Sequence, residues 1–197
     1  MTIIAISNLK GGTGKTTSAV LLATAFYRAG NSATVVDLDP QGSATEWAQM
    51  AEETGQPLPF PVTLGNVRTT KNIKENTDYT ILDCPPGDPR LIDAAIGVAD
   101  LVVVPVQPSG IETERMWDTV DIAGKGKGKA IVLLTSVLIQ AKSTTALSDA
   151  LTEEGVRVFR GAIPRREEIR HWYGHSPHGQ LHGYESIAQQ IKEARHD

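Results

Sequence analysis

The sequence is poor in cysteine, in long apolar runs and in excess positive charge. Its single cysteine, Cys84, cannot form an intramolecular disulfide framework, so we expect a chain that works in the reducing cytoplasm. No apolar stretch approaches the roughly 20 residues that span a bilayer, and the N-terminus leads directly into a predicted strand instead of a signal peptide. The net charge of −4 excludes a wholly basic surface, so nucleic-acid binding would require a local patch.

The chain has a regular alternation of strand and helix patterns. Its 197 residues and 40% hydrophobic content suit a single domain over residues 1–197. Apolar β-branched runs alternate with helical periodicity at least six times, which predicts an α/β, doubly wound, mostly parallel sheet with helices on both faces. The expected strands cover 2–7, 33–36, 79–82, 100–106, 130–134 and about 156–159, and the expected helices include 111–123, about 144–154 and 184–194.

A glycine-rich turn at residues 8–17 joins the first strand to the first helix. Gly11, Gly12 and Gly14 let the backbone aim its N–H groups inward, as a phosphate-binding loop requires. Lys15 is placed to reach the β- and γ-phosphates of a nucleotide, and the Thr16 hydroxyl to ligate Mg²⁺. The sequence therefore predicts binding of ATP with Mg²⁺ by this loop, whose binding residues are Lys10, Gly11, Gly12, Thr13, Gly14, Lys15, Thr16 and Thr17.

The loop departs from the usual P-loop pattern in two ways. Leu9 stands where the pattern has its first glycine, and a second lysine, Lys10, enters the loop. Lys-Gly-Gly-Thr-Gly-Lys-Thr-Thr is a deviant Walker A motif and resembles the ParA/MinD family of ATPases. The resemblance implies an ATP-bound homodimer in which Lys10 of each subunit reaches the other subunit's phosphates. It places Lys10 with Lys15 among the catalytic residues.

A carboxylate-rich segment, Asp37-Leu38-Asp39-Pro40-Gln41, follows the second predicted strand. Carboxylates at the carboxyl end of such a strand point to the crevice where ligands bind in doubly wound sheets. The segment matches the family's switch I motif, which implies that Asp39 positions the attacking water and that Asp37 supports the Mg²⁺ shell. Ser43, with Glu46 three residues later, predicts an N-cap and capping box for the next helix.

Asp83 follows another apolar strand in the arrangement of a Walker B motif, continuing Asp83-Cys84-Pro85-Pro86-Gly87. The family's switch II resembles this stretch, which implies that Asp83 holds Mg²⁺ through water and that Gly87 presents its N–H to the γ-phosphate. Cys84 could instead suggest an iron–sulfur ligand, but a cluster needs more cysteines than one per chain, so we interpret Cys84 as a buried packing residue.

A turn, Gly161-Ala162-Ile163-Pro164-Arg165, follows the last predicted strand. The family carries a similar turn beside the adenine, which implies adenine contacts from Pro164. Arg165, Arg166 and Arg170 lie close enough in sequence to share one face, and we predict that they bind DNA phosphates. The alternative is a solvated surface on which Glu167 and Glu168 pair with them. After this turn the family often has Glu-Ala-Pro, where this chain has Arg170-His171-Trp172-Tyr173.

The resemblance extends through three ordered motifs, at residues 10–17, 37–41 and 83–87. It implies a small ParA-like ATPase without an additional N-terminal DNA-reading domain, which partitions DNA cargo on the nucleoid. Its ATP-bound dimer would bind DNA without sequence preference, and a ParB-type centromere-binding partner would stimulate its slow hydrolysis.

Three other functions are consistent with the same fold. A ParA-like positioner of a protein organelle would have identical chemistry. A MinD-like membrane ATPase would end in a basic amphipathic helix, which 184–194 does not provide, so we expect no membrane binding. A ligase of the dethiobiotin synthetase type would need a carboxylate-substrate pocket, and the sequence contains no sign of one.

Overall fold

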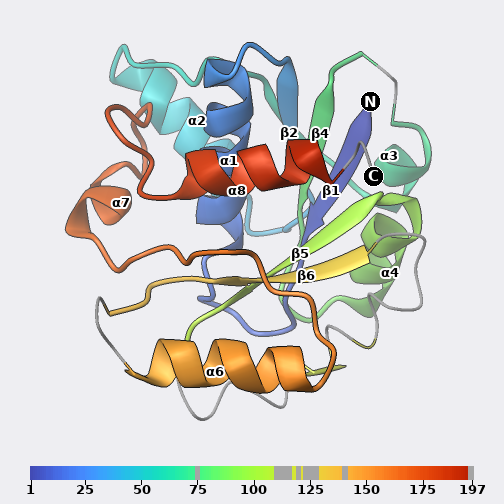
Figure 1. Cartoon of the computed structure of the whole chain (residues 1–197). Helices are drawn as coiled ribbons and strands as arrows, with labels where there is room; N and C mark the ends of the chain where they lie inside the picture. Colours follow the sequence, from blue (N-terminus) through green and yellow to red (C-terminus); the bar gives the residue numbers. More distant parts are fainter. Residues whose placement is uncertain (74–75, 109–116, 119–120, 122–128, 139–141, 195–197) are drawn as a thin grey trace.

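The fold is built on one parallel sheet of six strands (Figure 1). The computed structural model describes residues 1–73, 76–108, 117–118, 121, 129–138 and 142–194. The spatial order of the strands is β3-β2-β4-β1-β5-β6, and every neighbouring pair is parallel. The strands are β1 (Thr2–Ile6), β2 (Ala33–Asp37), β3 (Val62–Leu64), β4 (Tyr79–Asp83), β5 (Leu101–Val106) and β6 (Lys129–Leu134). The predicted α/β class with a parallel sheet is confirmed.

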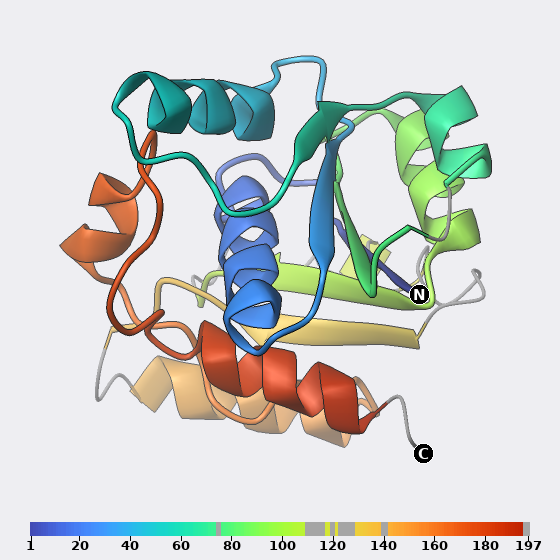
Figure 2. The same cartoon turned by 90° about the horizontal axis from the view of Figure 1, so that it is seen from above.

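Helices cover both faces of this sheet (Figure 2). One face packs against α1 (Lys15–Arg28), α2 (Ser43–Glu53) and α8 (Tyr184–Glu193). The other packs against α4 (Pro89–Val98) and α6 (Lys142–Glu153), and α3 (Val67–Lys71) lies beside α4. The short helix α7 (Glu167–His171) lies near the nucleotide loop.

The central strands are buried on both faces of the sheet, which accounts for their continuous apolar sequences. All five residues of β1 are buried, and its side chains alternate between the two cores, Ile4 and Ile6 in one and Ile3 and Ala5 in the other. A strand covered on both faces must be apolar throughout, as parallel sheets require. Cys84 is fully buried in the second core, as predicted, and burial raises the pKa of its thiol.

Helix α1 is the central element of the first face. Most of it is buried, because the sheet lies on one side and α8 on the other, whereas Tyr27 and Arg28 at its end are exposed. The Ser18 and Tyr184 hydroxyls, 3.0 Å apart, join α1 to α8 within this core. The predicted apolar stripe of the last helix, formed by Tyr184, Ile187, Ala188 and Ile191, is buried as expected.

The strand expected at 156–159 is wrong in extent. The chain makes only an isolated parallel bridge from Val158 to Val132 and another from Pro164 to Val137. Left-handed glycine turns at Gly155 and Gly161 flank this segment, and Pro164 has no N–H to donate, so a continuous ladder cannot form. Of the helix expected at 111–123, only residues 117–118 and 121 are described, and the rest lies outside the described residues.

No helix in the described ranges combines the length and the apolar character needed to cross a membrane.

Candidate nucleotide-binding site

The loop at residues 8–14 leads into an exposed helix N-terminus. Gly14 precedes α1 in the left-handed region with φ of 89°, where a side chain would be strained. No side chain caps α1, and its first turn contains no acidic residue. The first N–H groups of the helix are therefore available to an anion, and the helix dipole favours negative charge there.

Three side-chain hydrogen bonds between the loop and other parts of the chain hold the loop in shape. Asn8 Nδ2 donates to the Pro105 carbonyl at 2.7 Å, and Gln107 Nε2 donates to the Gly12 carbonyl at 2.8 Å. Thr135 Oγ1 donates to the Thr13 carbonyl at 3.0 Å. Sequence reasoning missed these supporting roles, although Gln107 and Thr135 directly follow β5 and β6, where a crevice-facing residue is expected.

Lys15 is buried beneath the loop. Its Nζ donates to the Lys10 carbonyl at 2.8 Å, which uses one of its three N–H donors. Burial lowers the pKa of Lys15, and the nearby Asp83 carboxylate opposes that shift. A partly desolvated ammonium with free donors is well placed to bind a phosphate.

The Asp83 carboxylate is buried at the carboxyl end of β4. Neither of its oxygens has a hydrogen-bond partner of normal geometry among the described residues. Burial raises the pKa of Asp83 to about 7, and the Thr16 hydroxyl partly opposes this rise. A divalent cation would satisfy both oxygens, so Asp83 and Thr16 fit the predicted Mg²⁺ site.

Few protein ligands are needed for this ion, because Mg²⁺ is usually held by one or two carboxylates together with phosphates and water. Consistent with that, the described residues contain no group of three or more His, Cys, Asp or Glu side chains arranged for a metal.

Asp37 lies opposite Asp83 in the register of β2 and β4, but its oxygens are already bonded. Oδ2 accepts from the N–H and the hydroxyl of Thr45, at 2.9 and 3.0 Å, and Oδ1 accepts from the Asp39 N–H at 3.1 Å. Asp37 thus caps α2 from a neighbouring strand, and its part in the Mg²⁺ shell stays a prediction.

The predicted capping box at Ser43 is wrong. Gly42 is the N-cap residue, with φ of 69° and no side-chain bond, and Ser43 is already in the helix. The Glu46 N–H, which the capping box would bond to Ser43, donates to the Gly42 carbonyl at 2.8 Å. The Thr45 N–H donates to the Asp37 carboxylate. Glu46 accepts instead from the Tyr173 hydroxyl.

Two cavities adjoin the loop. The first, which we call the switch cavity, has a volume of about 340 Å³ and brings Lys15, Thr16 and Asp39 together. Pro86 also lines it, whereas Gly87 is not among its lining residues. Trp47 and Tyr173, which the sequence did not suggest, complete its wall.

The second cavity, which we call the arginine cavity, has a volume of about 200 Å³ and lies on the other side of Gly12, Thr13 and Gly14. Pro164 lines it, next to the loop as predicted, together with Arg165, Arg166 and Arg170. The N–H of Arg165 donates to the Val137 carbonyl at 2.8 Å, which fixes this turn beyond β6. The three arginines are exposed and therefore also reach solvent.

The expected alternative, in which acidic neighbours neutralise these arginines, is not observed. Glu168 lies 2.6 Å from His182 Nε2 instead. In the part of the chain that the structure describes, none of the three arginines is in an ion pair.

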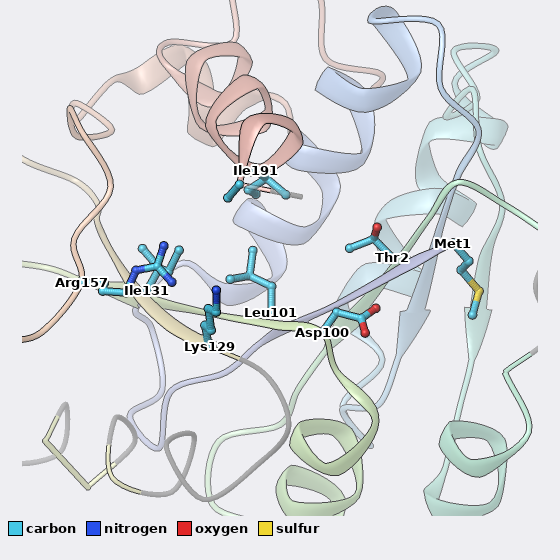
Figure 3. A pocket seen from close by; sticks show the side chains of 9 residues that line it. Met1, Thr2, Asp100, Leu101, Lys129, Ile131, Arg157 and Ile191 are labelled. Carbon is cyan, nitrogen blue, oxygen red and sulfur yellow. The ribbon is translucent and has the colours of Figure 1, made fainter. Parts of the chain in front are cut away.

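A separate cavity of about 320 Å³ lies at the opposite edge of the sheet from the nucleotide loop, where the strands begin (Figure 3). Thr2, Leu101 and Lys129, the first residues of β1, β5 and β6, line it together with Ile191 and Arg157. In this fold ligands bind at the carboxyl ends of the strands, so we do not assign the nucleotide to this cavity.

Residues 4–176 match the family described as the CobQ/CobB/MinD/ParA nucleotide binding domain. The chain is 32% identical over 181 residues to a maintenance of carboxysome distribution protein A from Gloeobacter kilaueensis, covering 82% of this chain and 76% of the relative. It is 29% identical over 204 residues to the chromosome-partitioning ATPase Soj of Thermus thermophilus, covering 84% and 82%.

Solved structures share the fold. A plasmid partition protein from Borrelia burgdorferi, bound to AMPPNP, superposes with a TM-score of 0.81 at 18% identity over 98% of this chain and 99% of that one. Cobyrinic acid a,c-diamide synthase from Mycobacterium smegmatis, with a bound ATP analogue and magnesium, superposes with a TM-score of 0.79 at 18% identity over 99% and 95%.

Proposed function

Because the chain belongs to the CobQ/CobB/MinD/ParA family of nucleotide-binding domains, we propose that it is a Mg²⁺-dependent ATPase that partitions DNA. The observation that carries this proposal is the switch cavity, in which Lys15 and Thr16 from the loop face Asp39 from the segment after β2. A phosphate-binding lysine and a carboxylate that faces the same space are what hydrolysis of a terminal phosphate requires.

Each residue of the cavity has a distinct part in the proposed reaction. Lys15 and the N–H groups at the start of α1 bind the phosphates, and Thr16 and Asp83 hold Mg²⁺. Bound Mg²⁺ supplies positive charge that offsets the charge on the phosphate oxygens. Asp39 orients the water that attacks the γ-phosphate. We expect the protein alone to hydrolyse ATP slowly. None of the described residues that line the switch cavity serves as an arginine finger in cis, which is a device that increases the rate about 10³–10⁵-fold.

The second loop lysine makes the ATP-bound state a dimer in this proposal. Lys15 already serves the phosphates of its own subunit, and the deviant Walker A motif implies that the Lys10 side chain reaches the phosphates of a second copy. The closed dimer binds DNA through Arg165, Arg166 and Arg170, which are exposed beside the arginine cavity. Hydrolysis stimulated by a ParB-type partner then releases the DNA, which gives a cytoplasmic protein that associates with the nucleoid in its ATP state.

The experiment that tests the class of function is a binding assay with two surfaces. Purified protein is mixed with random-sequence DNA or with liposomes of anionic lipid, each with ATP or with ADP. Partition predicts ATP-dependent binding to DNA and none to liposomes. ATP-dependent binding to liposomes would instead support a MinD-like function, and binding to neither would contradict both.

Positioning of a protein organelle is the second candidate, and a specific comparison favours it. The relative from Gloeobacter kilaueensis is named for maintenance of carboxysome distribution. The chemistry at the nucleotide would be the same, so only the cargo separates the two functions. A pull-down uses the protein held in its ATP-bound state by a non-hydrolysable analogue. It would recover a centromere-binding protein if the cargo is DNA, and an organelle-associated protein otherwise.

A further inference from the structure

The segment that follows the Pro164 turn connects the two cavities of the nucleotide site. Arg170, near the end of α7, lines the arginine cavity, and Tyr173, three residues later, lines the switch cavity. Residues 165–175 therefore cross from one side of the loop to the other. We call this segment the strap.

The strap is anchored to the body of the protein near its middle. Trp172 is buried, and its ring stacks on that of His182 with centroids 5.6 Å apart. His182 Nε2 also lies 2.6 Å from a carboxylate oxygen of Glu168, within α7. Because both contacts fix the strap close to Tyr173, the position of Tyr173 is set by the tertiary structure.

Three consecutive residues of the strap then pack on α2. The Tyr173 hydroxyl donates to Glu46 Oε2 at 2.5 Å, and its ring lies 5.4 Å from that of Trp47. Trp47 Nε1 donates to the His175 carbonyl at 2.8 Å. Gly174 has φ of 77° and contacts Met50 so closely that a Cβ there would lie 2.8 Å from the Met50 methyl group.

The first turn of α2 is in turn bonded to the switch segment. Glu46 directly follows Thr45, whose N–H and hydroxyl both donate to Asp37. The other oxygen of Asp37 accepts from the Asp39 N–H. A continuous set of bonded neighbours thus runs from Tyr173 through the first turn of α2 to Asp39.

We propose that Tyr173 is a positioning residue for hydrolysis: through Glu46, its hydroxyl holds the first turn of α2, and with it Asp39, in the geometry that the γ-phosphate requires. This inference rests on the proposed function, because it assumes that Asp39 orients the attacking water. Burial and the Glu46 carboxylate raise the pKa of Tyr173 to about 12, so the phenol remains a neutral donor at physiological pH.

The test separates the hydroxyl from the ring. Tyr173→Phe keeps the ring against Trp47 and removes only the hydrogen bond. We expect kcat for ATP to fall about three- to tenfold, the range for one partly exposed hydrogen bond, while affinity for a fluorescent ATP analogue changes less than about twofold. A purely packing role for Tyr173 predicts no change in kcat.

Substitutions of Glu46 complete a double-mutant cycle. Glu46→Ala should match Tyr173→Phe, and Glu46→Gln should recover most of the loss, because its amide oxygen still accepts from the hydroxyl. The double variant Tyr173→Phe/Glu46→Ala should be no slower than either single variant, since both remove the same contact.

Asp39→Ala distinguishes failure of this inference from failure of the proposed function. If Asp39→Ala hydrolyses ATP at the wild-type rate, the role of Asp39 is wrong and the inference fails with it. If Asp39→Ala is inactive, three results overturn the positioning role alone. These are a wild-type kcat in Tyr173→Phe, multiplied effects in the double variant, and an equal loss of nucleotide affinity and kcat.

Discussion

At the scale of single residues, the charged side chains of the site have hydrogen-bonding capacity that a bound ligand can use. The Lys15 ammonium donates one of its three N–H groups to the Lys10 carbonyl, which leaves the others for a ligand. Asp83 holds two buried oxygens with no hydrogen-bond partner of normal geometry in the described part of the chain. Both arrangements cost stability in the free protein, and binding of a phosphate and of a cation would offset that cost.

The first prediction at this scale concerns the phosphate-binding lysine. Lys15→Ala should abolish nucleotide binding, because the phosphate charge loses its direct cation. Thr16→Ala should keep nucleotide affinity in the absence of metal and lose most of its enhancement by Mg²⁺. Titration of a fluorescent ATP analogue with and without Mg²⁺ measures both. Normal ATP affinity in Lys15→Ala would contradict the assignment of the loop.

The second prediction at this scale concerns the pH dependence that Asp83 causes. Its pKa is about 7 in the folded chain, above the ordinary 3.8, so between these values the folded state keeps a proton that the unfolded state has lost. The contribution of Asp83 to the free energy of unfolding should therefore be largest below about pH 4. It should decline as the pH rises to about 7, by at most about 4 kcal/mol.

Urea unfolding in EDTA at pH 4.5 and pH 7.5 measures this effect against Asp83→Asn. The loss of stability of Asp83→Asn between the two pH values is subtracted from that of the wild type. This subtraction removes the contribution of all other titrating groups. The asparagine variant should lose less stability over this range than the wild type does. Equal losses in both proteins would show that Asp83 does not titrate as its burial indicates.

At the scale of elements, the short edge strand β3 depends on how closely it approaches β2. Gly65, directly after β3, donates its N–H to the Asp37 carbonyl at 2.8 Å. A Cβ on Gly65 would lie 2.4 Å from Val36 Cγ1 and 2.8 Å from Leu38 Cδ2. The absence of a side chain at this position therefore lets the sheet edge pack next to the switch segment.

Gly65→Ala should destabilise the protein by about 1–3 kcal/mol, because the methyl group must displace packed side chains. Gly97→Ala in α4 is the matched control, since a Cβ built there would meet no described atom within 4 Å apart from its chain neighbours and its own helix backbone. The control should be neutral or stabilising by up to about 1 kcal/mol, because alanine favours a helix. Urea unfolding compares the two, and equal stabilities would contradict the packing account.

At the scale of the whole molecule, two groups of basic residues from the second half of the chain lie in separate places. Arg165, Arg166 and Arg170 line the arginine cavity beside the nucleotide loop. Lys129 and Arg157 line the cavity at the opposite edge of the sheet. A surface for DNA that responds to ATP is more directly explained by the first group, because the bound nucleotide would lie next to it.

Charge reversal tests this choice of surface. Arg165→Glu with Arg166→Glu should weaken binding to random-sequence DNA in ATP by at least about tenfold. The log–log salt slope should become about 3.6 less steep, because each of the two subunits of the dimer loses two phosphate contacts. Lys129→Glu with Arg157→Glu makes the same change in charge at the other edge and should have a much smaller effect.

Nucleotide affinity is measured for both double variants, because the first pair also lines a cavity of the site. Loss of nucleotide binding in the first pair would assign these arginines to the nucleotide instead. A larger loss of DNA affinity in the second pair would move the DNA surface to the opposite edge.

The second prediction at this scale concerns the ATP-dependent dimer. Lys10→Gln should keep ATP binding and lose the dimer, because only the side chain is proposed to reach the other subunit. The Lys10 N–H and carbonyl, which bond Asn8 Oδ1 and Lys15 Nζ, are unchanged by this substitution. Sedimentation with a non-hydrolysable analogue measures assembly, and an intact dimer in Lys10→Gln would refute the role.

The sequence by itself determined the features that depend on neighbouring residues. Strands buried on both faces must be apolar along their length, so the β1 pattern was visible without a structure. The loop at residues 8–17 could be identified because glycines, lysine and threonine must stand at fixed spacing to hold phosphates. Placing Asp37 and Asp83 at the ends of parallel strands followed from the same local patterns, and their register confirms that they lie together.

Only the tertiary structure decided which distant groups complete these local features. The first turn of α2 is capped by the Asp37 carboxylate, which accepts from the Thr45 N–H, and Ser43 lies inside the helix. Tyr173 lies 127 positions from Glu46, and no short-range pattern signals their contact. The arginines could be recognised as a basic cluster, but their place beside the loop depends on how the chain after β6 turns back. Such contacts depend on packing between elements, which local propensity and periodicity do not encode.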